Sequence, residues 1–479
     1  MPQPSEEPSP IVGTRLARKT NGIREMEEMR AQALSLSSWR GSFSKAVIEP
    51  TNLVRSVLGA PNEPRPRDVR VRRTDFCFVA LALAFPWSTT ITTGLVLLSL
   101  ICILFTYRPD EMIDGLKRPA CALPVLLVGL AAVGTAWADG IPWADRLHAF
   151  GKASKLVCFL PLFVHFQNSS RTRLVFAAYL LSNLLLLLLS FVVFCSPDIS
   201  ILIGAKSPGV PLKNYLDQTQ GFAFIAVICV ALAIEAIRHQ QRGQAIAFAA
   251  IAVAFFANLA FVNIARTAFI YLPVMLALVT IRSVRGWPSL AVLVAVCVLV
   301  VGAWGVSPNL QFKMARLLGE VDAYETNTMV IGGLETGGAE RLEFWRKSVG
   351  AIRSAPIVGH GTGSTKELFA NEAAGQTGIR AKIVDNPHNQ TLAVAIQWGA
   401  IGCIVLYAMW GAHLLLFTEG LSRRKGSLLA WIGLLAVAQN IVSSLLNSHL
   451  FDFYQGWLYV IAVAIVGGQL QRRRDTDQS

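Results

Sequence analysis

Long apolar runs separated by short polar segments occupy the chain from about Phe76 to its end. The first run, Phe76–Thr106, exceeds one comfortable membrane span and is interrupted at Pro86-Trp87-Ser88. It therefore predicts two short helices joined by a tight turn. Most later runs have the length of a single membrane-crossing helix, which brings the total to about twelve spans. The pattern predicts an all-α polytopic membrane protein.

Lysine and arginine cluster in alternate short loops, as expected for loops on the cytoplasmic side of a membrane. Alternation then places both termini in the cytoplasm, and it places residues 139–155 and 196–220 in loops on the opposite side. The ninth span is expected over Leu290–Gly305. The other spans from the third to the eleventh are expected to end near Trp137, Phe166, Cys195, Arg238, Ile264, Arg282, Phe417 and Leu446.

This layout divides the chain into five segments. They are a cytoplasmic polar tail (1–74), spans one to nine (75–305), a large polar loop (306–387), spans ten to twelve (388–470) and a second cytoplasmic tail (471–479). Acidic and basic residues are roughly balanced in the large loop, unlike in the short basic loops. We therefore expect it to be a folded, helical extramembrane domain.

One stretch of this loop, ERLEFWRKSVGAI, has the periodicity of an amphipathic helix. Its apolar positions share a face, and Arg341 and Arg346 flank that face. We expect Glu343 and Lys347 to point outward as an i,i+4 pair. Such a helix suits a membrane surface, with the arginines extending beyond its apolar side. The residues of the apolar face are Leu342, Trp345, Val349 and Ile352.

Composition agrees with a membrane protein and excludes several other classes. The chain of 479 residues is 53% hydrophobic and only 15% charged. Its formal net charge of +13 comes mostly from the first tail and the short loops, which does not indicate nucleic-acid binding. The eight cysteines lie in or beside apolar runs without a CxxC pair, so we expect neither a disulfide framework nor a structural zinc site.

The candidate chemistry is concentrated where the large loop meets the tenth span, at Asn386-Pro387-His388-Asn389. Pro387 suits a first helical turn, with Asp385 or Asn386 as its N-cap. His388 would then lie in that turn, at the positive end of the helix dipole, which favours a neutral imidazole and nearby anions. The alternative is a histidine that only anchors a helix end at the membrane interface.

The spacing around His388 carries a family resemblance. His388-Asn389 is followed by nine residues and then by Gly399 and Gly402, which resembles the signature of the O-antigen ligase family. Members of this family also carry an Arg-x-x-x-Leu pattern at the start of a span. It is matched here by Arg266–Ile270, with isoleucine in place of leucine. The family arginine of the large loop is matched best by Arg341; Arg346 and Arg316 remain alternatives.

The resemblance implies glycosyl transfer at the periplasmic face of a Gram-negative inner membrane. The donor would be O-antigen polysaccharide on undecaprenyl pyrophosphate, and the acceptor a sugar hydroxyl of lipid A-core, without metal or cofactor and with inversion at the anomeric carbon. His388 would be the general base, and Arg266 and Arg341 would bind phosphate. Weaker substrate-binding candidates are Asn389, Arg346, Lys152, Lys155, Lys213, Tyr215 and Gln218, although charged residues in such loops are usually only solvated.

Three other functions remain open at this stage. An O-antigen polymerase would use the same donor with a second lipid-linked glycan as acceptor. A protein O-oligosaccharyltransferase usually has a larger C-terminal soluble region than the one after Gln469. A transporter of lipid-linked glycans would place ionisable residues at mid-membrane, whereas the notable ones here lie at helix ends beside a large loop, which favours an enzyme.

Overall fold

The computed structural model describes residues 69–202, 204, 205, 207–283, 294, 298, 301, 302, 304–327, 330, 331, 334, 335, 337–423 and 427–478. Helices form nearly all of it, apart from a hairpin of two short strands, β1 (Val330–Ile331) and β2 (Leu334–Glu335). The helices are α3 (Val69–Ala84), α4 (Thr89–Leu104), α5 (Pro109–Leu116), α6 (Pro119–Val133), α7 (Trp143–Ser154), α8 (Phe159–Asn168), α9 (Thr172–Cys195), α10 (Pro197–Leu202), α11 (Tyr215–Arg238), α12 (Arg242–Ala257), α13 (Ala268–Ser283), α15 (Pro308–Glu325), α16 (Gly337–Ser354), α17 (Thr365–Ala373), α18 (Gln390–Arg423), α19 (Leu428–Ser443) and α20 (Phe453–Gln478).

The helical, multi-pass character predicted from the sequence is confirmed. Six helical segments of the described chain are long and apolar enough to cross a membrane, and the bent pair α4–α5 makes a seventh candidate. Three shorter apolar helices, α6, α13 and α19, accompany them. The total of twelve spans stays a prediction. More than half of the predicted ninth span lies outside the described residues, as does most of the first tail.

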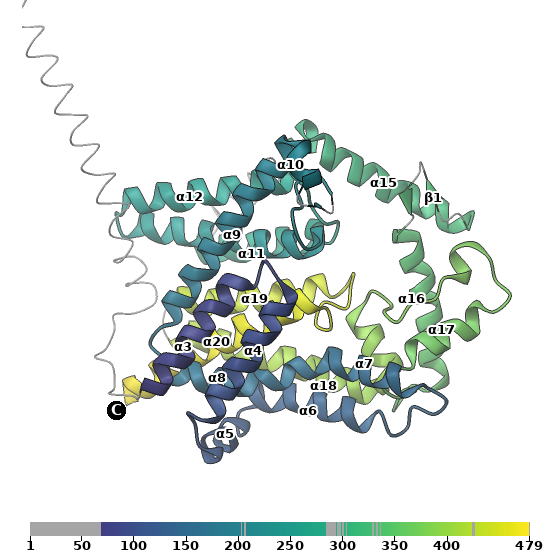
Figure 1. Cartoon of the computed structure of the whole chain (residues 1–479), viewed down its shortest axis with the longest axis horizontal. Helices are drawn as coiled ribbons and strands as arrows, with labels where there is room; N and C mark the ends of the chain where they lie inside the picture. The colour runs from purple at the N-terminus through teal and green to yellow at the C-terminus, as the bar shows by residue number, and fades with distance from the viewer. Residues whose placement is uncertain are drawn as a thin grey trace, which may run out of the picture.

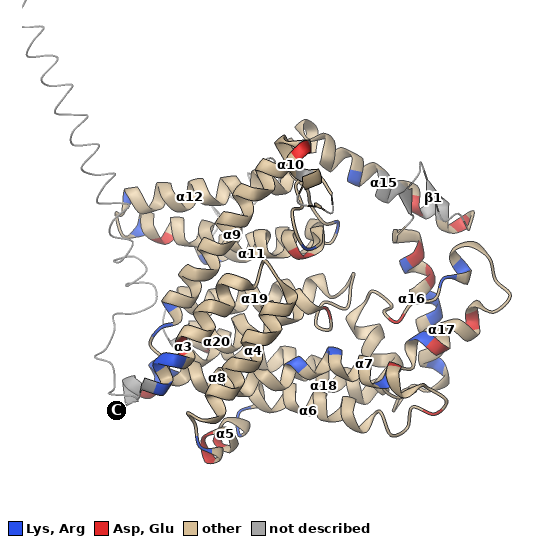
Figure 2. Ribbon diagram, in the orientation of Figure 1, with Lys and Arg blue, Asp and Glu red and all other residues tan. Residues whose placement is uncertain are grey.

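The helices form a bundle with a smaller helical unit at one end (Figure 1). The C-terminal end of α20 lies at the opposite end from α16, α17 and the β1–β2 hairpin. Charged residues are found chiefly toward these two ends and are sparse along the middle of the bundle (Figure 2). Here the end that carries α7, α15, α16 and α17 is called the loop-domain end.

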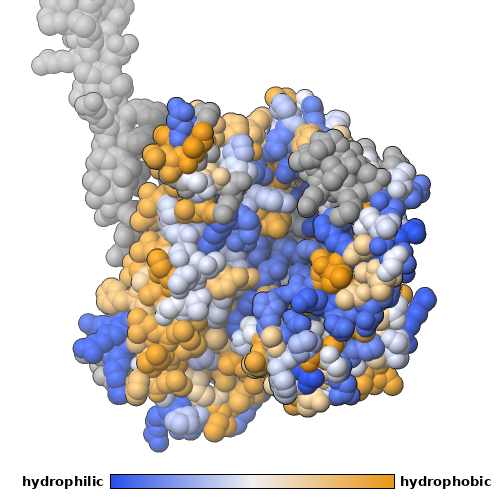
Figure 3. Space-filling model, turned by 45° about the vertical axis from the view of Figure 1, so that its right-hand side comes forward, coloured by the Kyte–Doolittle hydropathy of each residue, from blue (hydrophilic) through white to orange (hydrophobic). Residues whose placement is uncertain are grey.

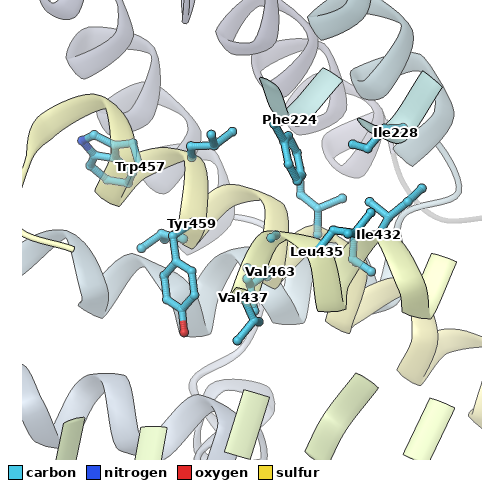
Figure 4. Close-up of a cluster of buried hydrophobic side chains, with 14 of the residues drawn as sticks. Phe224, Ile228, Ile432, Leu435, Val437, Trp457, Tyr459 and Val463 are labelled. Carbon is cyan, nitrogen blue, oxygen red and sulfur yellow. The ribbon is translucent and has the colours of Figure 1, made fainter. Parts of the chain in front are cut away.

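Close side-chain packing holds the bundle together, since lipid supplies little hydrophobic force between helices. Part of the core is formed where α11, α19 and α20 meet, with Phe224, Leu435 and Val463 in one buried cluster (Figure 4). The α8–α20 contact depends on a small residue. A Cβ at Gly468 would lie 2.5 Å from the carbonyl oxygen of Phe163, so glycine lets the two backbones approach closely.

Residues 139–155, predicted as a loop, are largely helical, and that prediction is wrong. Helix α7 occupies most of the segment and continues through a 3₁₀ turn, Lys155–Cys158, into α8. Polar side chains of α7 find local partners. Arg146 donates from Nε to the Ile141 carbonyl at 2.8 Å and from Nη1 to that of Thr135 at 2.7 Å. Such pairing lets a polar segment fold as the start of a span.

Helix α16 is confirmed, but its predicted orientation is wrong. Glu343 and Lys347 are fully buried, whereas Leu342 and Val349 are exposed. The buried lysine is stabilised because its Nζ donates to two backbone carbonyls, those of Arg380 at 2.7 Å and Lys382 at 3.1 Å. The periodicity predicted the helix correctly. Its polar face is buried because partners for that face come from a segment more than thirty residues away in the sequence.

Helix α18 is broken at Gly399, one of the two signature glycines. Its backbone has φ 58° and ψ −152°, a conformation essentially restricted to glycine. The loop before α17 fills the break. The N–H groups of Ala400 and Ile401 bond to the carbonyls of Pro356 and Ile357 at 2.9 and 3.3 Å. A Cβ at Gly399 would lie 2.3 Å from the Ile357 oxygen, so the spacing encodes this junction.

Candidate functional site

His388 lies just outside α18, and its predicted place in the first helical turn is wrong. The helix begins at Gln390, and Asn389 is its N-cap, accepting the N–H of Leu392 on its side chain at 3.1 Å. His388 has a positive φ of 54° and donates its backbone N–H to Asn386 Oδ1 at 2.8 Å. In this side-chain turn Asn386 bonds to the backbone of His388 and is not the N-cap of α18.

The imidazole is oriented by a chain of two further side chains. His388 Nδ1 lies 2.7 Å from Asn447 Oδ1, and Asn447 Nδ2 donates to Asp452 Oδ2 at 2.9 Å. A carboxylate only accepts, so the amide nitrogen must face Asp452 and the amide oxygen must face the histidine. Nδ1 therefore carries the proton, and the neutral ring presents Nε2 as an acceptor.

The surroundings of His388 lower the pKa of its imidazole. Burial is the largest cause, and the positive charge of Arg341 is the second; the hydrogen bond to Asn447 and the charges of Asp452 and Glu340 oppose them. The ring also stacks on Phe344 of α16, with centroids 5.9 Å apart. The sequence led us to expect a neutral histidine because of a helix dipole, whereas desolvation and a neighbouring guanidinium favour it here.

The loop between α19 and α20, which carries Asn447 and Asp452, is fixed by buried contacts. Lys155 Nζ donates to the carbonyls of Phe451 at 2.8 Å and Asp452 at 2.6 Å. Asn389 Nδ2 donates to the Leu445 carbonyl at 2.9 Å. Lys155 and Asn389, both predicted to bind substrate, thus make backbone contacts that position the loop.

Arg266 precedes α13 and follows the end of a π-helical turn, Asn258–Val262, by four residues. Its Nη1 donates to both carboxylate oxygens of Glu320 on α15 at 2.5 Å. The guanidinium also lies near the first turn of α16, since a Cβ at Gly337 would be 3.5 Å from Nη2. Arg266 does precede an apolar helix, as predicted, and its partner is an acid from the large loop; that this helix is a membrane span stays a prediction.

Arg341 lies between the other two predicted groups. Its charge acts on Arg266 and on His388, and its pKa is lowered, by burial first and by Arg266 second. It makes no hydrogen bond or ion pair with any residue in the part of the chain that the structure describes. Within the described part of the chain, Arg341 is therefore a half-buried cation that no carboxylate pairs directly, although Glu320 and Glu340 lie within electrostatic range.

The molecule has an open, polar side. When the loop-domain end is turned forward, the surface is hollowed at its centre, and the hollow is hydrophilic beside a hydrophobic bundle wall (Figure 3). Tyr215, at the start of α11, is 37% exposed and lies within electrostatic range of Arg341. Lys313 of α15 lies over its ring, 5.0 Å from the centroid. The site can therefore hold an anionic group.

The remaining predicted residues make other contacts. Arg346 bonds to Glu343 and Glu372 and is 53% exposed. Lys213 donates to the Phe85 carbonyl at 2.6 Å, and burial lowers its pKa to about 8. Gln218 donates to the Gly209 carbonyl at 2.9 Å. Lys152 pairs with Asp385 at 2.6 Å. None of these five contacts involves His388 or Arg341. The side chain of Arg316 lies outside the described residues.

Sequence reasoning missed three residues of this arrangement, namely Asn447, Asp452 and Glu320. The first two lie in NSHLFDFYQ, a short polar segment that follows the expected end of the eleventh span. Its density of amide, histidine and carboxylate side chains in so few residues was the available signal. Glu320 gave no such signal, because it is one of several acids in a polar helix.

Together these groups offer an oriented proton acceptor beside two guanidiniums. Comparison with known proteins is consistent with that chemistry. A search of the curated proteins found no match. Residues 250–407 match the family model described as O-antigen ligase, a range that includes Arg266, Arg341, His388 and Gly399. This match agrees with the resemblance found in the sequence, and it is consistent with the O-antigen ligase superfamily.

Proposed function

We propose that this protein is an O-antigen ligase, which transfers O-antigen polysaccharide from undecaprenyl pyrophosphate to a sugar hydroxyl of lipid A-core. One observation carries the proposal. Asn447 and Asp452 hold His388 so that Nε2 has no hydrogen-bond partner among the described residues, and the neighbouring Arg341 forms no ion pair with any of them. A base and a cation side by side are what glycosyl transfer from a pyrophosphate donor requires.

In this mechanism His388 is the general base. As the acceptor hydroxyl oxygen bonds to the anomeric carbon, its proton moves to Nε2, and the bond from that carbon to the pyrophosphate oxygen breaks. Arg341 and Arg266 stabilise the negative charge on the departing undecaprenyl pyrophosphate through charge-assisted hydrogen bonds. Direct displacement inverts the anomeric configuration. Asn447 and Asp452 keep the imidazole in the tautomer that accepts the proton.

We place the loop-domain end in the periplasm of a Gram-negative bacterium, with the C-terminus in the cytoplasm. The basic short loops support this orientation. Single cysteines introduced at Gln376, which is exposed in the loop domain, and at Arg473 test it in intact cells. A membrane-impermeant maleimide should label position 376 alone. Labelling of position 473 alone would show that the protein has the opposite orientation in the membrane.

Reconstitution with two acceptors tests the activity itself. Purified protein receives undecaprenyl-pyrophosphate-linked glycan with either lipid A-core or a second lipid-linked glycan. A ligase attaches the glycan to lipid A-core and leaves the second lipid-linked glycan unextended. Extension of the second glycan without transfer to lipid A-core would identify a polymerase and overturn the proposal. His388→Ala is the control for activity from contaminating enzymes.

A further inference from the structure

An acidic side chain already occupies the anion-binding side of the site. Glu320 is almost completely buried, with 4% of its side chain exposed, and both of its oxygens accept from Arg266 Nη1. The start of α16 leaves space for this carboxylate. A Cβ at Gly338 would lie 1.8 Å from Glu320 Oε2, so the carboxylate fits only because residue 338 is glycine.

The position of this carboxylate is chemically suited to a phosphate. It combines a guanidinium with the first turn of an eighteen-residue helix, where backbone N–H groups lack intrahelical partners. Arg341 lies within electrostatic range of both Glu320 and Arg266. Two guanidiniums therefore lie near this point, and a single carboxylate cannot neutralise both of their charges.

Among the side chains that the structure describes, the charges around this point do not balance. Arg266 and Arg341 contribute two positive charges, and Glu320 contributes one negative charge. The nearby Glu340 is already paired with Lys382, whose Nζ lies 2.6 Å from its Oε1. A pyrophosphate diester carries two negative charges, which match two arginines. Glu320 and the phosphates cannot share Arg266 without strong like-charge repulsion.

We propose that Glu320 is an internal anion that occupies the donor-phosphate position on Arg266 and is displaced when the pyrophosphate of a lipid-linked donor binds. The identity of this donor rests on the proposed function. Displacement moves the Glu320 side chain, and with it the end of α15, away from the start of α16. The carboxylate then sets donor affinity and leaves the proton transfer at His388 unchanged, so Glu320 is a positioning residue and not a catalytic one.

Calorimetric titration of the purified full-length protein with inorganic pyrophosphate tests this role without any transfer reaction. Glu320→Gln keeps the shape but removes the charge, and it should bind pyrophosphate at least about tenfold more tightly than wild type. Gly338→Ala fills the space of the carboxylate and should weaken binding. Glu325→Gln, at an exposed position of the same helix, is the matched control and should leave binding unchanged.

Thermal unfolding adds a second readout for these variants. Without pyrophosphate, Glu320→Gln should unfold at a lower temperature than wild type, because the Arg266 guanidinium loses its paired carboxylate. With pyrophosphate it should gain the larger upward shift. Glu320→Ala serves the same purpose if the glutamine variant does not fold. In transfer assays the donor KM should fall with kcat maintained.

Equal or weaker pyrophosphate binding by Glu320→Gln would overturn the proposal, as would an absence of binding by every variant. The proposed function fails by a different result, namely no transfer by wild type to lipid A-core. Transfer by wild type without a gain in Glu320→Gln refutes only the displacement. Tighter pyrophosphate binding without transfer to lipid A-core supports the anion site and refutes the ligase assignment.

Discussion

The two sides of the site differ in how completely their polar groups are paired. On the histidine side, His388, Asn447 and Asp452 form a connected chain whose loop is fixed by Lys155. On the arginine side, Arg341 has no close partner among the described residues, and Arg266 is held only by an acid that can be replaced. The proton acceptor is preorganised, whereas the anion site is left incomplete.

This difference matches the needs of the two steps. A general base must keep one tautomer and one orientation throughout the reaction, and buried hydrogen bonds provide both. A charged lipid-linked donor must enter and leave, which full pairing of both arginines would oppose. The mutations below break one side at a time, beginning with the largest expected effect.

Removal of the base should cost the most. His388→Ala should lower the transfer rate by about 10²–10⁴, the usual contribution of general-base catalysis. Donor binding should persist because the arginine side is intact. Initial rates and pyrophosphate titration on the same preparation check both statements. If donor binding were lost together with the transfer rate, the role of His388 would be substrate binding and not proton transfer.

Removal of the Arg341 guanidinium should mainly weaken donor binding. Arg341→Ala should raise the donor KM and reduce kcat/KM by about 10², because charge-assisted hydrogen bonds to phosphate are lost. Arg341→Lys should restore only part of this, since a point charge lacks the planar fork. Arg353→Ala, at an exposed position in the last turn of the same helix, is the control. Equal effects at positions 341 and 353 would contradict the assignment.

Breaking the chain behind the histidine should have an intermediate effect with a pH signature. Asp452→Asn should lower kcat by about 10–100-fold, as seen for groups that orient a histidine. The Asp452 charge raises the pKa of His388, so its removal lowers that pKa. The acid limb of the rate profile should then move to lower pH. A limb that moves toward neutral pH would show that Asp452 does not act through His388.

Substitution of Gly399, at the break in α18, should affect the stability of the protein more than the transfer rate. Gly399→Ala forces a non-glycine residue into a glycine-only conformation against the Ile357 carbonyl, at a cost of about 3 kcal/mol or more. Gly411→Ala has open space in the same helix and should be neutral or stabilising by about 0.5–1 kcal/mol. Denaturation in detergent compares the two variants. Equal stability would mean that α18 is not broken at Gly399.

Much of the fold could be predicted from the sequence, because apolar run length and breaker residues are local signals. The turn at Pro86-Trp87-Ser88, the α9 span and the start of α13 after Arg266 all follow from them. Two kinds of error arose. Residues 139–155 were interpreted as a loop because they are polar, and α16 was turned the wrong way because the carbonyls that stabilise Lys347 come from residues 380 and 382.

The site was predictable to the extent that spacing encodes it. The signature residues His388 and Gly399 were found, and the best-matched loop arginine, Arg341, lies beside His388. Partners that come from distant segments were not predicted. Asn447 lies 59 residues after His388, and Glu320 lies 54 residues after Arg266, so only folding reveals the pairing. Lys155 and Lys213 were sought as substrate contacts, but their partners are backbone carbonyls.

The pH dependence of kcat/KM, measured for wild type and His388→Gln in one assay, tests the central claim most directly. Burial and Arg341 lower the pKa of His388, so the wild-type rate should fall only as pH drops below the ordinary histidine value of about 6.5. His388→Gln keeps a hydrogen-bond donor but cannot take up the proton, so it should be slow and lack this acid limb. A fast His388→Gln protein, or a wild-type rate that does not fall on acidification, would contradict the assignment of His388 as the base.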